Sequence, residues 1–371
     1  MKYLAVLGRQ PEMSIAELEL SDFCTDIDRL GGVQKLAVLM EQRPLEYLQA
    51  LPEGKITIGV SDYSKKASKK SASQEALKLK KILVRHGRSV RVVENKDAVL
   101  STATSLHNGL SGKNERKVEL IKVDDDWYRV IGVQDIDAYA KRDQARPARD
   151  AKVGMLPPKL AQILINLCGP LSEGSVILDP FCGTGVVLQE AILMGYHAYG
   201  TDVSKRMVEY SQKNLKWFLS EHCDQRGACS SEPRNDGRER EREERNLFQV
   251  QVGDATTFQW EQPIDAVACE GYLGKPFSKI PTEMELKEQR QECGAIVLGF
   301  LKNLASQIKS KTPVTIAVPA WLRENGEYSR LEIIDEIEKL GYNVNNKTRE
   351  GLLYHREKQI VARDILILRK K

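Results

Sequence analysis

The chain has 371 residues, of which 41% are hydrophobic and 29% are charged, a composition typical of a soluble globular protein. These values exclude collagen-like, mucin-like and wholly disordered chains, and the length allows two or three domains. The longest apolar runs are too short to span a bilayer, and the first residues lack the pattern of a signal peptide. Seven scattered cysteines without a framework spacing predict a cytoplasmic protein that is not associated with a membrane.

The net charge of +4 is small, but it is unevenly distributed along the chain. Residues 51–100 carry 12 Lys or Arg against 5 Asp or Glu, whereas residues 151–200 carry 2 against 3. A basic block beside a charge-poor segment favours one region that contacts a polyanion and another that builds a buried sheet.

The first half of the chain predicts a mixture of strands and helices. Strands are expected at 3–7, 56–60, 90–93, 119–123 and 127–133, and helices after Ser14 and from Ser73 to Val84. In the second of these helices Ala76, Leu79 and Leu83 fall at helical spacing, so its lysines project elsewhere. A polar, proline-punctuated connector at 134–158 places a domain boundary near residue 150.

The second half alternates between the two element types. Helices are expected at 159–167, 185–194, 204–220, 283–310 and 329–340, and strands at 175–178, 197–201, 248–252, 264–269, 314–318, 342–345 and 364–368. This alternation predicts an α/β fold with a mainly parallel sheet that is covered on both faces. Residues 222–246 form a charged run, which is expected to be a solvated loop or a disordered insertion.

Acidic residues follow three successive strands of this half. Asp179 comes after the first strand and opens the glycine-rich turn Asp179–Gly185, in which Gly183 and Gly185 allow close approach of a ligand. Asp202 follows the next strand and suits the two hydroxyls of a ribose, and Asp254 follows the third and suits an adenine amine. Alone, Asp202 is better explained as a helix cap and Asp254 as a turn residue, but the joint order of the three acids indicates an adenosyl pocket.

Several stretches resemble the tRNA guanine N2-methyltransferases of archaea and eukaryotes that act on guanosine at position 10. These stretches are Tyr3–Glu19, Ala145–Leu167, LDPFCGTG and the C-terminal LLYHREKQIVARDILILRK. The resemblance implies S-adenosylmethionine as cofactor and tRNA as partner. It also implies a ferredoxin-like segment at 1–59, a THUMP-like RNA-binding domain at 60–135, a linker at 136–158, and a Rossmann-like class I methyltransferase domain at 159–371. The cofactor residues are then Asp179, Phe181, Gly183, Gly185, Asp202 and Asp254.

The chain departs from amino-directed methyltransferases after the fourth strand of this domain. Those enzymes carry an Asp/Asn/Ser-Pro-Pro-Tyr-like motif, whose oxygens orient a weakly nucleophilic amine and whose aromatic ring stacks on the flipped base. Aligned on Tyr272, this chain has Cys269 at the polar position, with Glu270 and Gly271 in place of the prolines. Glu270 and Tyr272 are therefore the expected catalytic pair, the glutamate acting from one residue further on.

Two other interpretations remain open at this stage: a methyltransferase that acts on another nucleic-acid atom, and a non-catalytic RNA-binding protein with a methyltransferase fold. The expected phosphate contacts are Lys65, Lys66, Lys69, Lys70, Arg142 and Arg146. Solvated helix lysines are the alternative for the first four, and pairing with Asp137, Asp143 or Asp150 for the arginines. Cys223 and Cys229 lack zinc-site spacing, so no metal is expected. A small accessory subunit is not excluded by the residues.

Overall fold

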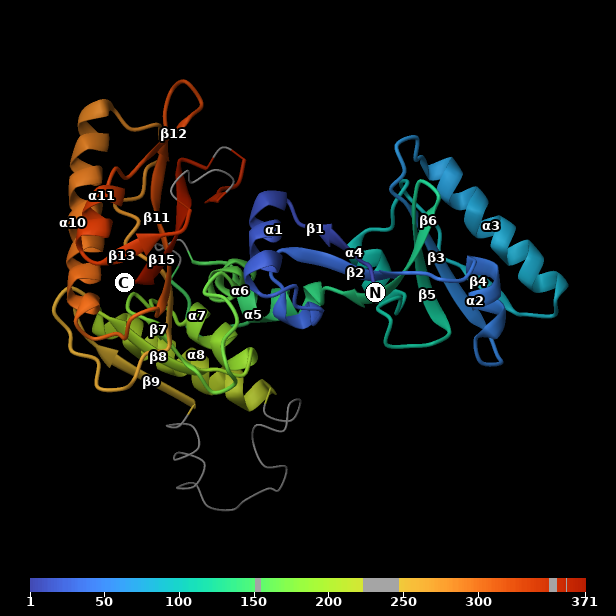
Figure 1. Ribbon diagram of the computed structural model, residues 1–371, viewed down its shortest axis with the longest axis horizontal. Helices are drawn as coiled ribbons and strands as arrows, with labels where there is room; N and C mark the ends of the chain where they lie inside the picture. Colours follow the sequence, from blue (N-terminus) through green and yellow to red (C-terminus); the bar gives the residue numbers. More distant parts are fainter. Residues whose placement is uncertain (151–154, 223–246, 347–351, 358) are drawn as a thin grey trace, which may run out of the picture. The chain divides into compact units, whose positions relative to one another are not determined.

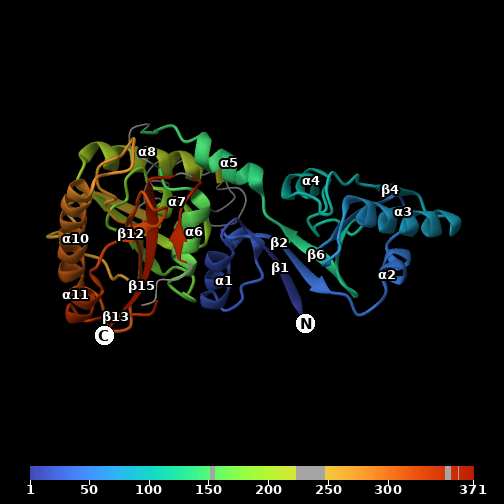
Figure 2. The ribbon, with the colours of Figure 1, turned by 90° about the horizontal axis from the view of Figure 1, so that it is seen from above.

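The computed structural model describes residues 1–150, 155–222, 247–346, 352–357 and 359–371. The chain divides into two compact units, each with its own sheet (Figures 1 and 2). Unit 1 comprises Met1–Arg9 and Cys24–Tyr139, and unit 2 comprises Gln10–Phe23 and Ala140–Lys371.

Unit 1 is a six-stranded sheet in the order β1-β2-β6-β5-β3-β4 with helices between its strands. Strand β3 is parallel to β4 and β5, and the other neighbours are antiparallel. The elements are β1 (Tyr3–Leu7), a short 3-10 helix (Ile27–Arg29), β2 (Val33–Leu39), α2 (Pro44–Ala50), β3 (Ile56–Asp62), α3 (Lys69–Arg85), β4 (Val90–Val92), α4 (Thr102–His107), β5 (Lys117–Val123) and β6 (Asp126–Val133).

Helix α3 forms because its sequence supplies both a cap and an apolar face. The Ser68 hydroxyl accepts a hydrogen bond from the Ser71 N–H at 3.1 Å, so a helix donor that lacks an intrahelical partner is satisfied. The predicted apolar face is confirmed, because Ala76, Leu79 and Leu83 pack into the core with β3 and β5. The helix starts several residues before the predicted Ser73, because the cap lies at Ser68.

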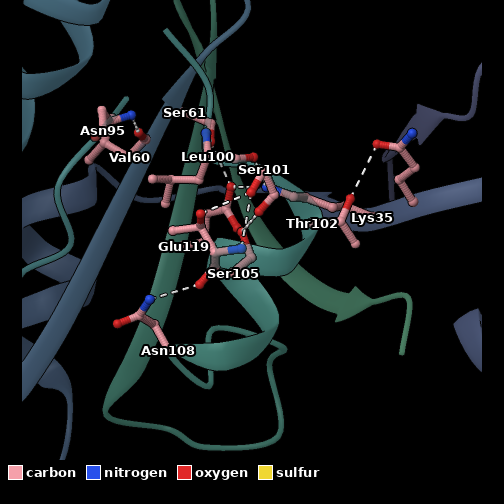
Figure 3. A network of polar contacts seen from close by, with 12 residues as sticks. Lys35, Val60, Ser61, Asn95, Leu100, Ser101, Thr102, Ser105, Asn108 and Glu119 are labelled. Atoms are coloured by element: carbon pink, nitrogen blue, oxygen red, sulfur yellow. Dashed lines mark hydrogen bonds and ion pairs between the residues drawn. The ribbon is translucent and has the colours of Figure 1, made fainter. Parts of the chain in front are cut away.

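A buried ionic network ties the strands of unit 1 to the loop before α4 (Figure 3). The Lys35 ammonium donates to Glu119 Oε1 at 2.6 Å and to the Leu100 carbonyl at 2.7 Å. The Ser61 hydroxyl also donates to Glu119 Oε1, and it accepts from the Leu100 N–H. Three strands and one loop therefore share a desolvated charge pair, which is costly to break by removing one partner.

Unit 2 is a nine-stranded mixed sheet in the order β13-β15-β11-β10-β7-β8-β9, with β12 beside β11 and β14 beside β15. Pairing is parallel from β11 to β9 and antiparallel between the remaining neighbours. Its helices are α1 (Pro11–Leu20), α6 (Pro158–Asn166), α7 (Val186–Leu193), α8 (Lys205–His222), α10 (Glu283–Ala305) and α11 (Ile334–Lys339). Its strands are β7 (Val176–Asp179), β8 (His197–Asp202), β9 (Phe248–Val252), β10 (Ala266–Glu270), β11 (Pro313–Leu322), β12 (Tyr328–Arg330), β13 (Tyr342–Val344), β14 (Leu353–Tyr354) and β15 (Val361–Lys370). Helix α5 (Ile136–Gln144) crosses the boundary between the units.

Both faces of the unit 2 sheet are covered, as the alternating sequence predicts. Helices α1, α6, α7 and α8 pack on one face, and α10 and α11 pack on the other (Figure 1). The α/β fold class is therefore confirmed, whereas the THUMP assignment of the N-terminal half stays a prediction. The expected helix at 329–340 is instead strand β12 followed by α11, and the charged run at 223–246 lies outside the described residues.

The division into units differs from the expected domain boundaries in two respects. A boundary between residues 59 and 60 would cut β3, whose residues Ile56–Asp62 pair continuously with their neighbours. Helix α1 belongs to unit 2 although β1 and β2 on either side of it belong to unit 1. It is held there by the buried Met13 and by a 2.7 Å hydrogen bond from the Asn166 amide of α6 to Glu17.

Replacing Met13 by Ala should destabilise unit 2 and leave unit 1 unchanged. Met13 is 1% exposed within the unit 2 core, so its truncation removes packing worth about 2–5 kcal/mol. Hydrogen exchange followed by peptide should show faster exchange in α6 and α7 but not in the unit 1 sheet. Ile15→Ala is the matched control, because Ile15 lies on the same helix but is 45% exposed. Faster exchange confined to unit 1 would contradict the assignment of α1.

Candidate functional site

The order of the unit 2 strands marks one position on the sheet as a ligand site. From β7 the chain proceeds outward through β8 and β9, and it then returns to the other side of β7 to form β10 and β11. All of these neighbouring pairs are parallel, so their carboxyl ends lie at one edge. Open α/β sheets bind ligands outside the carboxyl ends where the strand order reverses, which here is between β7 and β10.

The glycine-rich turn that follows β7 uses its two predicted glycines for different purposes. Gly185 has φ +83° and begins α7, and a Cβ there would collide with the Ser211 hydroxyl of α8. Gly183 has φ +51°, but the space beside it is open, since the nearest atom to a Cβ would be the Phe181 carbonyl oxygen at 3.9 Å. Gly185 therefore permits helix packing, and Gly183 offers an uncrowded backbone to a ligand.

Asp202, at the end of β8, fixes the glycine turn directly. Its Oδ2 accepts a hydrogen bond from the Gly183 N–H at 2.9 Å, and its Oδ1 accepts one from the Ser204 N–H at 2.8 Å. Partial burial raises the pKa of this carboxyl, and the two backbone N–H donors act in the opposite direction. The structure thus brings Asp202 and Gly183 together, as the cofactor hypothesis requires.

Asp179 ends β7 and is almost fully buried. Its Oδ1 accepts the Phe181 N–H at 3.1 Å. Burial raises the pKa of Asp179 well above its usual range, and the negative charges of Asp202 and Glu270 raise it further. Phe181 itself is half-buried, with its ring edge-to-face on Phe300 at 5.3 Å, and its contact with a cofactor stays a prediction.

Asp254, after β9, is exposed in a tight turn. Its Oδ1 accepts both the Thr256 N–H at 2.9 Å and the Thr256 hydroxyl at 2.7 Å, and these hydrogen bonds lower the pKa of Asp254. Within the described chain Oδ2 has no hydrogen-bond partner. Asp254 is therefore ionised and has one oxygen available to an amine donor.

The end of β10 explains why the sequence has cysteine at the expected polar position. Side chains of a strand alternate between the two faces of a sheet. Cys269 lies fully buried in the core under α10, where burial raises the pKa of its thiol well above the usual range. Glu270, the next residue, points to the other face at the carboxyl edge. The carboxylate of this segment is therefore available one residue after the position that alignment on Tyr272 selects.

Glu270 is paired with an arginine that the sequence analysis did not single out. The Arg363 Nε–H of β15 donates to Glu270 Oε1, although 93 residues separate the two positions. Burial raises the pKa of Glu270 and the Arg363 guanidinium opposes this shift. A sequence signal for this pair existed, because Arg363 and Asp364 interrupt the apolar run at 361–368.

Tyr272 is half-buried beside the same edge. Its ring packs against the core under α10, and its hydroxyl donates to Glu292 Oε1 at 3.2 Å. These two contacts fix the orientation of the ring. The catalytic roles of Tyr272 and Glu270 stay predictions, but the structure places both residues after β10 at the edge that the strand order selects.

The expectation that Arg142 and Arg146 contact RNA phosphate is wrong, because both side chains are buried within unit 2. Arg142 forms two hydrogen bonds with Glu190 of α7, at 2.7 and 3.2 Å. Arg146 donates to the Thr184 hydroxyl in the glycine turn at 3.3 Å and to Asp143. These hydrogen bonds from the two arginines therefore hold the glycine turn and α7 in position.

Lys65, Lys66, Lys69 and Lys70 are all exposed around the start of α3 in unit 1. The first turn of this helix contains no acidic residue. Because the N-terminus of a helix carries a partial positive charge, lysines there add to an already positive potential. The arrangement does not favour helix stability, but it suits contact with an anion.

The part of the chain that the structure describes contains neither a metal-binding cluster nor a membrane-spanning helix. There, no group of three or more His, Cys, Asp or Glu side chains is arranged to hold a metal ion. Cys223 and Cys229 lie outside that part. In the same residues, no helix combines the length and the apolar character needed to cross a bilayer.

Comparison with known proteins supports a methyltransferase reaction class for the segment that contains this site. Residues 146–270, which include all three acids, match the family model described as the RMKL-like methyltransferase domain. The tRNA (guanine(10)-N2)-dimethyltransferase of Methanothermobacter thermautotrophicus is 46% identical over 78 residues, 20% of this chain and 23% of the relative. Its counterpart in Pyrococcus abyssi is 46% identical over 63 residues, 17% and 18% of the two chains. The matches thus span less than a quarter of these relatives' length.

Among solved structures, TrmN from Thermus thermophilus is similar with a TM-score of 0.42 and 15% sequence identity. The similarity covers 91% of this chain and 84% of that chain.

Replacing Asp179 by Asn should stabilise the cofactor-free protein at pH 7. Because the folded pKa is raised above 3.8, the unfolded chain loses its proton at lower pH, and stability falls as pH rises above 3.8. Asn keeps an oxygen for the Phe181 N–H and carries no charge. The melting temperature at pH 7 should therefore rise, and the difference from wild type should shrink as pH approaches 3.8.

Asp254→Asn is the control of opposite sign. The pKa of Asp254 is lowered, so its charged form stabilises the fold above the unfolded pKa and that contribution is lost as pH falls. Its melting temperature at pH 7 should not exceed that of wild type. A lower melting temperature for Asp179→Asn at pH 7 would contradict the argument.

Proposed function

We propose that this protein is an S-adenosylmethionine-dependent RNA methyltransferase that modifies the exocyclic N2 of a guanosine in tRNA. The observation that carries the proposal is the carboxyl edge of the unit 2 sheet beside the glycine turn, where Asp179 and Asp202 end two adjacent strands and Asp254 shortly follows a third. The match of residues 146–270 to a methyltransferase domain supports the reaction class. The names of the similar curated proteins support the substrate.

The residues at this edge fit an adenosyl group. Gly183 leaves open space beside the backbone, Asp202 lies against it to accept the ribose hydroxyls, and Asp254 retains a free oxygen for the adenine amine. When bound, S-adenosylmethionine supplies a methyl group that is activated by its sulfonium sulfur. The protein therefore has mainly to position the acceptor atom, because the leaving group needs no further activation.

The acceptor atom requires help because the lone pair of a guanine N2 amine is delocalised into the ring. A carboxylate that accepts a hydrogen bond from the amine orients this lone pair towards the methyl group, and an aromatic ring holds the flipped base flat. Glu270 supplies the carboxylate in this proposal, and Tyr272 supplies the ring, whose hydroxyl is anchored on Glu292. Burial raises the pKa of Glu270, and the pairing with Arg363 favours its ionised form against that rise.

Unit 1 supplies RNA binding in the same proposal. Its exposed lysines at the start of α3 neutralise phosphates. Lysines at the positive end of a helix do not stabilise that helix, so contact with RNA accounts for their presence there. The protein acts in the cytoplasm, in keeping with the free thiols of its described cysteines Cys24, Cys168, Cys182, Cys269 and Cys293. Nucleoside mass spectrometry of tRNA from cells that lack the protein tests the function as a whole, since one methylated guanosine should disappear.

The alternatives predict different outcomes of simple measurements. A non-catalytic RNA-binding protein transfers no methyl group to any RNA, whether or not it binds S-adenosylmethionine. A methyltransferase that acts on another atom gives a methylated nucleoside with a different retention and fragmentation pattern.

Replacing Glu270 by Gln should lower methyl transfer by about 10²-fold, because the amine loses its carboxylate partner. The dissociation constant for S-adenosylmethionine should not change, since Gln retains an acceptor for Arg363. Initial rates with tritiated cofactor and isothermal titration calorimetry measure the two quantities. Glu288→Gln is the control, because Glu288 is an exposed carboxylate of α10. Unchanged turnover in the Glu270 variant would remove this residue from the mechanism.

Replacing Lys65, Lys66, Lys69 and Lys70 by Ala should weaken RNA binding. Each phosphate contact contributes to the slope of log K against log salt, so four lost contacts should reduce the slope by about 3. Filter binding over a salt series measures it. The matched control replaces four exposed lysines of unit 2, Lys287, Lys302, Lys309 and Lys339, with the same change in net charge. An equal effect of both quadruple variants would show that only net charge matters.

A further inference from the structure

The Glu270–Arg363 pair has more hydrogen-bonding capacity than the protein uses. An arginine carries five N–H donors in a rigid planar fork. Within the described chain the only hydrogen bond of the Arg363 guanidinium is that from Nε to Glu270 Oε1. Glu270 Oε2 likewise has no hydrogen-bond partner among those residues. None of these remaining atoms is among the fully buried side-chain atoms that lack a partner, so they reach the surface and are available to a partner from outside the chain.

The sheet register brings the two side chains together across an intervening strand. Glu270 of β10 lies beside Ala317 of β11, and Pro319, two residues further along β11, lies beside Arg363 of β15. Residues two apart on a strand share a face, so the pair spans β11 on one side of the sheet. The small Ala317 side chain leaves room for this contact. Both groups therefore lie at the carboxyl edge, next to the end of β7.

Access to the pair is limited but present. The Glu270 side chain is 17% exposed and that of Arg363 is 6% exposed. In such a setting, few water molecules compete for the remaining N–H donors and carboxylate oxygen, and hydrogen bonds to a ligand discriminate strongly. The remaining N–H donors of Arg363 and the remaining acceptor of Glu270 lie side by side. A ligand that binds both groups must therefore present an acceptor next to a donor.

We propose that the Glu270–Arg363 pair recognises the Watson–Crick edge of the target guanine, with Arg363 Nη donating to O6 and Glu270 accepting from N1–H and the N2 amine. This inference rests on the proposed function and makes Arg363 its specificity-determining residue. Guanine presents an acceptor followed by two donors along this edge, which complements the pair. Adenine presents a donor where guanine has O6 and an acceptor at N1, so both contacts would be repulsive and the buried groups would lose their partners.

Arginine suits this role better than lysine. The guanidinium fork reaches one partner with Nε and another with Nη at the same time, whereas lysine is a single point charge. A lysine at position 363 can neutralise Glu270, but its ammonium ends near the position of the guanidinium carbon, one bond short of the Nη atoms that reach O6. Arg363→Lys therefore separates recognition of O6 from the structural need for a positive partner.

The test compares two RNAs that differ only at the methylated position, once that guanosine has been mapped with the wild-type protein. One RNA carries guanosine, and the other carries 6-thioguanosine, which keeps N1–H and the N2 amine but replaces O6 by sulfur, a weaker acceptor. The wild type should prefer guanosine in kcat/KM by about tenfold. In Arg363→Lys, kcat/KM for guanosine should fall by a similar factor, and the preference should disappear.

Arg330→Lys is the control, because Arg330 also faces a buried acid of β15, Asp364, at 3.8 Å and should keep the preference. A preference that persists in Arg363→Lys overturns the inference. If Arg363→Lys does not fold, as judged by its melting temperature and cofactor binding, equal rates of the wild type on both RNAs overturn it instead. A wild-type protein that methylates no RNA removes the proposed function and the inference together, and this outcome is distinct from an active enzyme without the O6 preference.

Discussion

A sheet that is covered by helices on both faces has only its strand ends available for chemistry, and the proposed site of this protein depends on that constraint. In unit 2 the carboxyl ends of β7, β8, β9 and β10 lie at one edge, and an acidic residue ends or shortly follows each strand. Acids that are brought together in this way are costly to keep ionised. The protein limits this cost by three means: backbone N–H donors for Asp202, a tight turn for Asp254 and an arginine for Glu270.

The connector that follows unit 1 helps to fix the geometry of the same edge. Arg142 and Arg146 bring two positive charges against α7 and the glycine turn, where Glu190 and Thr184 bind them. Buried ion pairs add little net stability, but removal of one partner is strongly destabilising. Such pairs fix geometry more than they add stability, and here they fix the position of the turn that presents Gly183.

Features that depend on local chain chemistry were predictable from the sequence. The glycine turn and the acids Asp179, Asp202 and Asp254 follow strands whose apolar runs are plain in the sequence, so their placement at one edge of the sheet was correctly anticipated. Strand β2 was missed because the buried Lys35 interrupts its apolar pattern, and its partner Glu119 is far away in the chain. Arg142 and Arg146 were misassigned because a basic connector looks the same whether its charges face solvent or a buried acid. The partner of Glu270 lies on a distant strand, and only the sheet register identifies it.

The placement of α1 constrains how the protein is made and how it can be divided. The chain begins in unit 1, contributes one helix to unit 2, returns to complete the first sheet and only then builds the second. During synthesis, α1 leaves the ribosome long before α6, the helix that binds it. The apolar face of α1 therefore stays unpacked until α6 has been made. No single cut in the chain separates the two units intact. A gene fragment that starts after residue 139 would encode a methyltransferase-like unit lacking one of its own helices, and evolution by simple fusion or loss of unit 1 is correspondingly restricted.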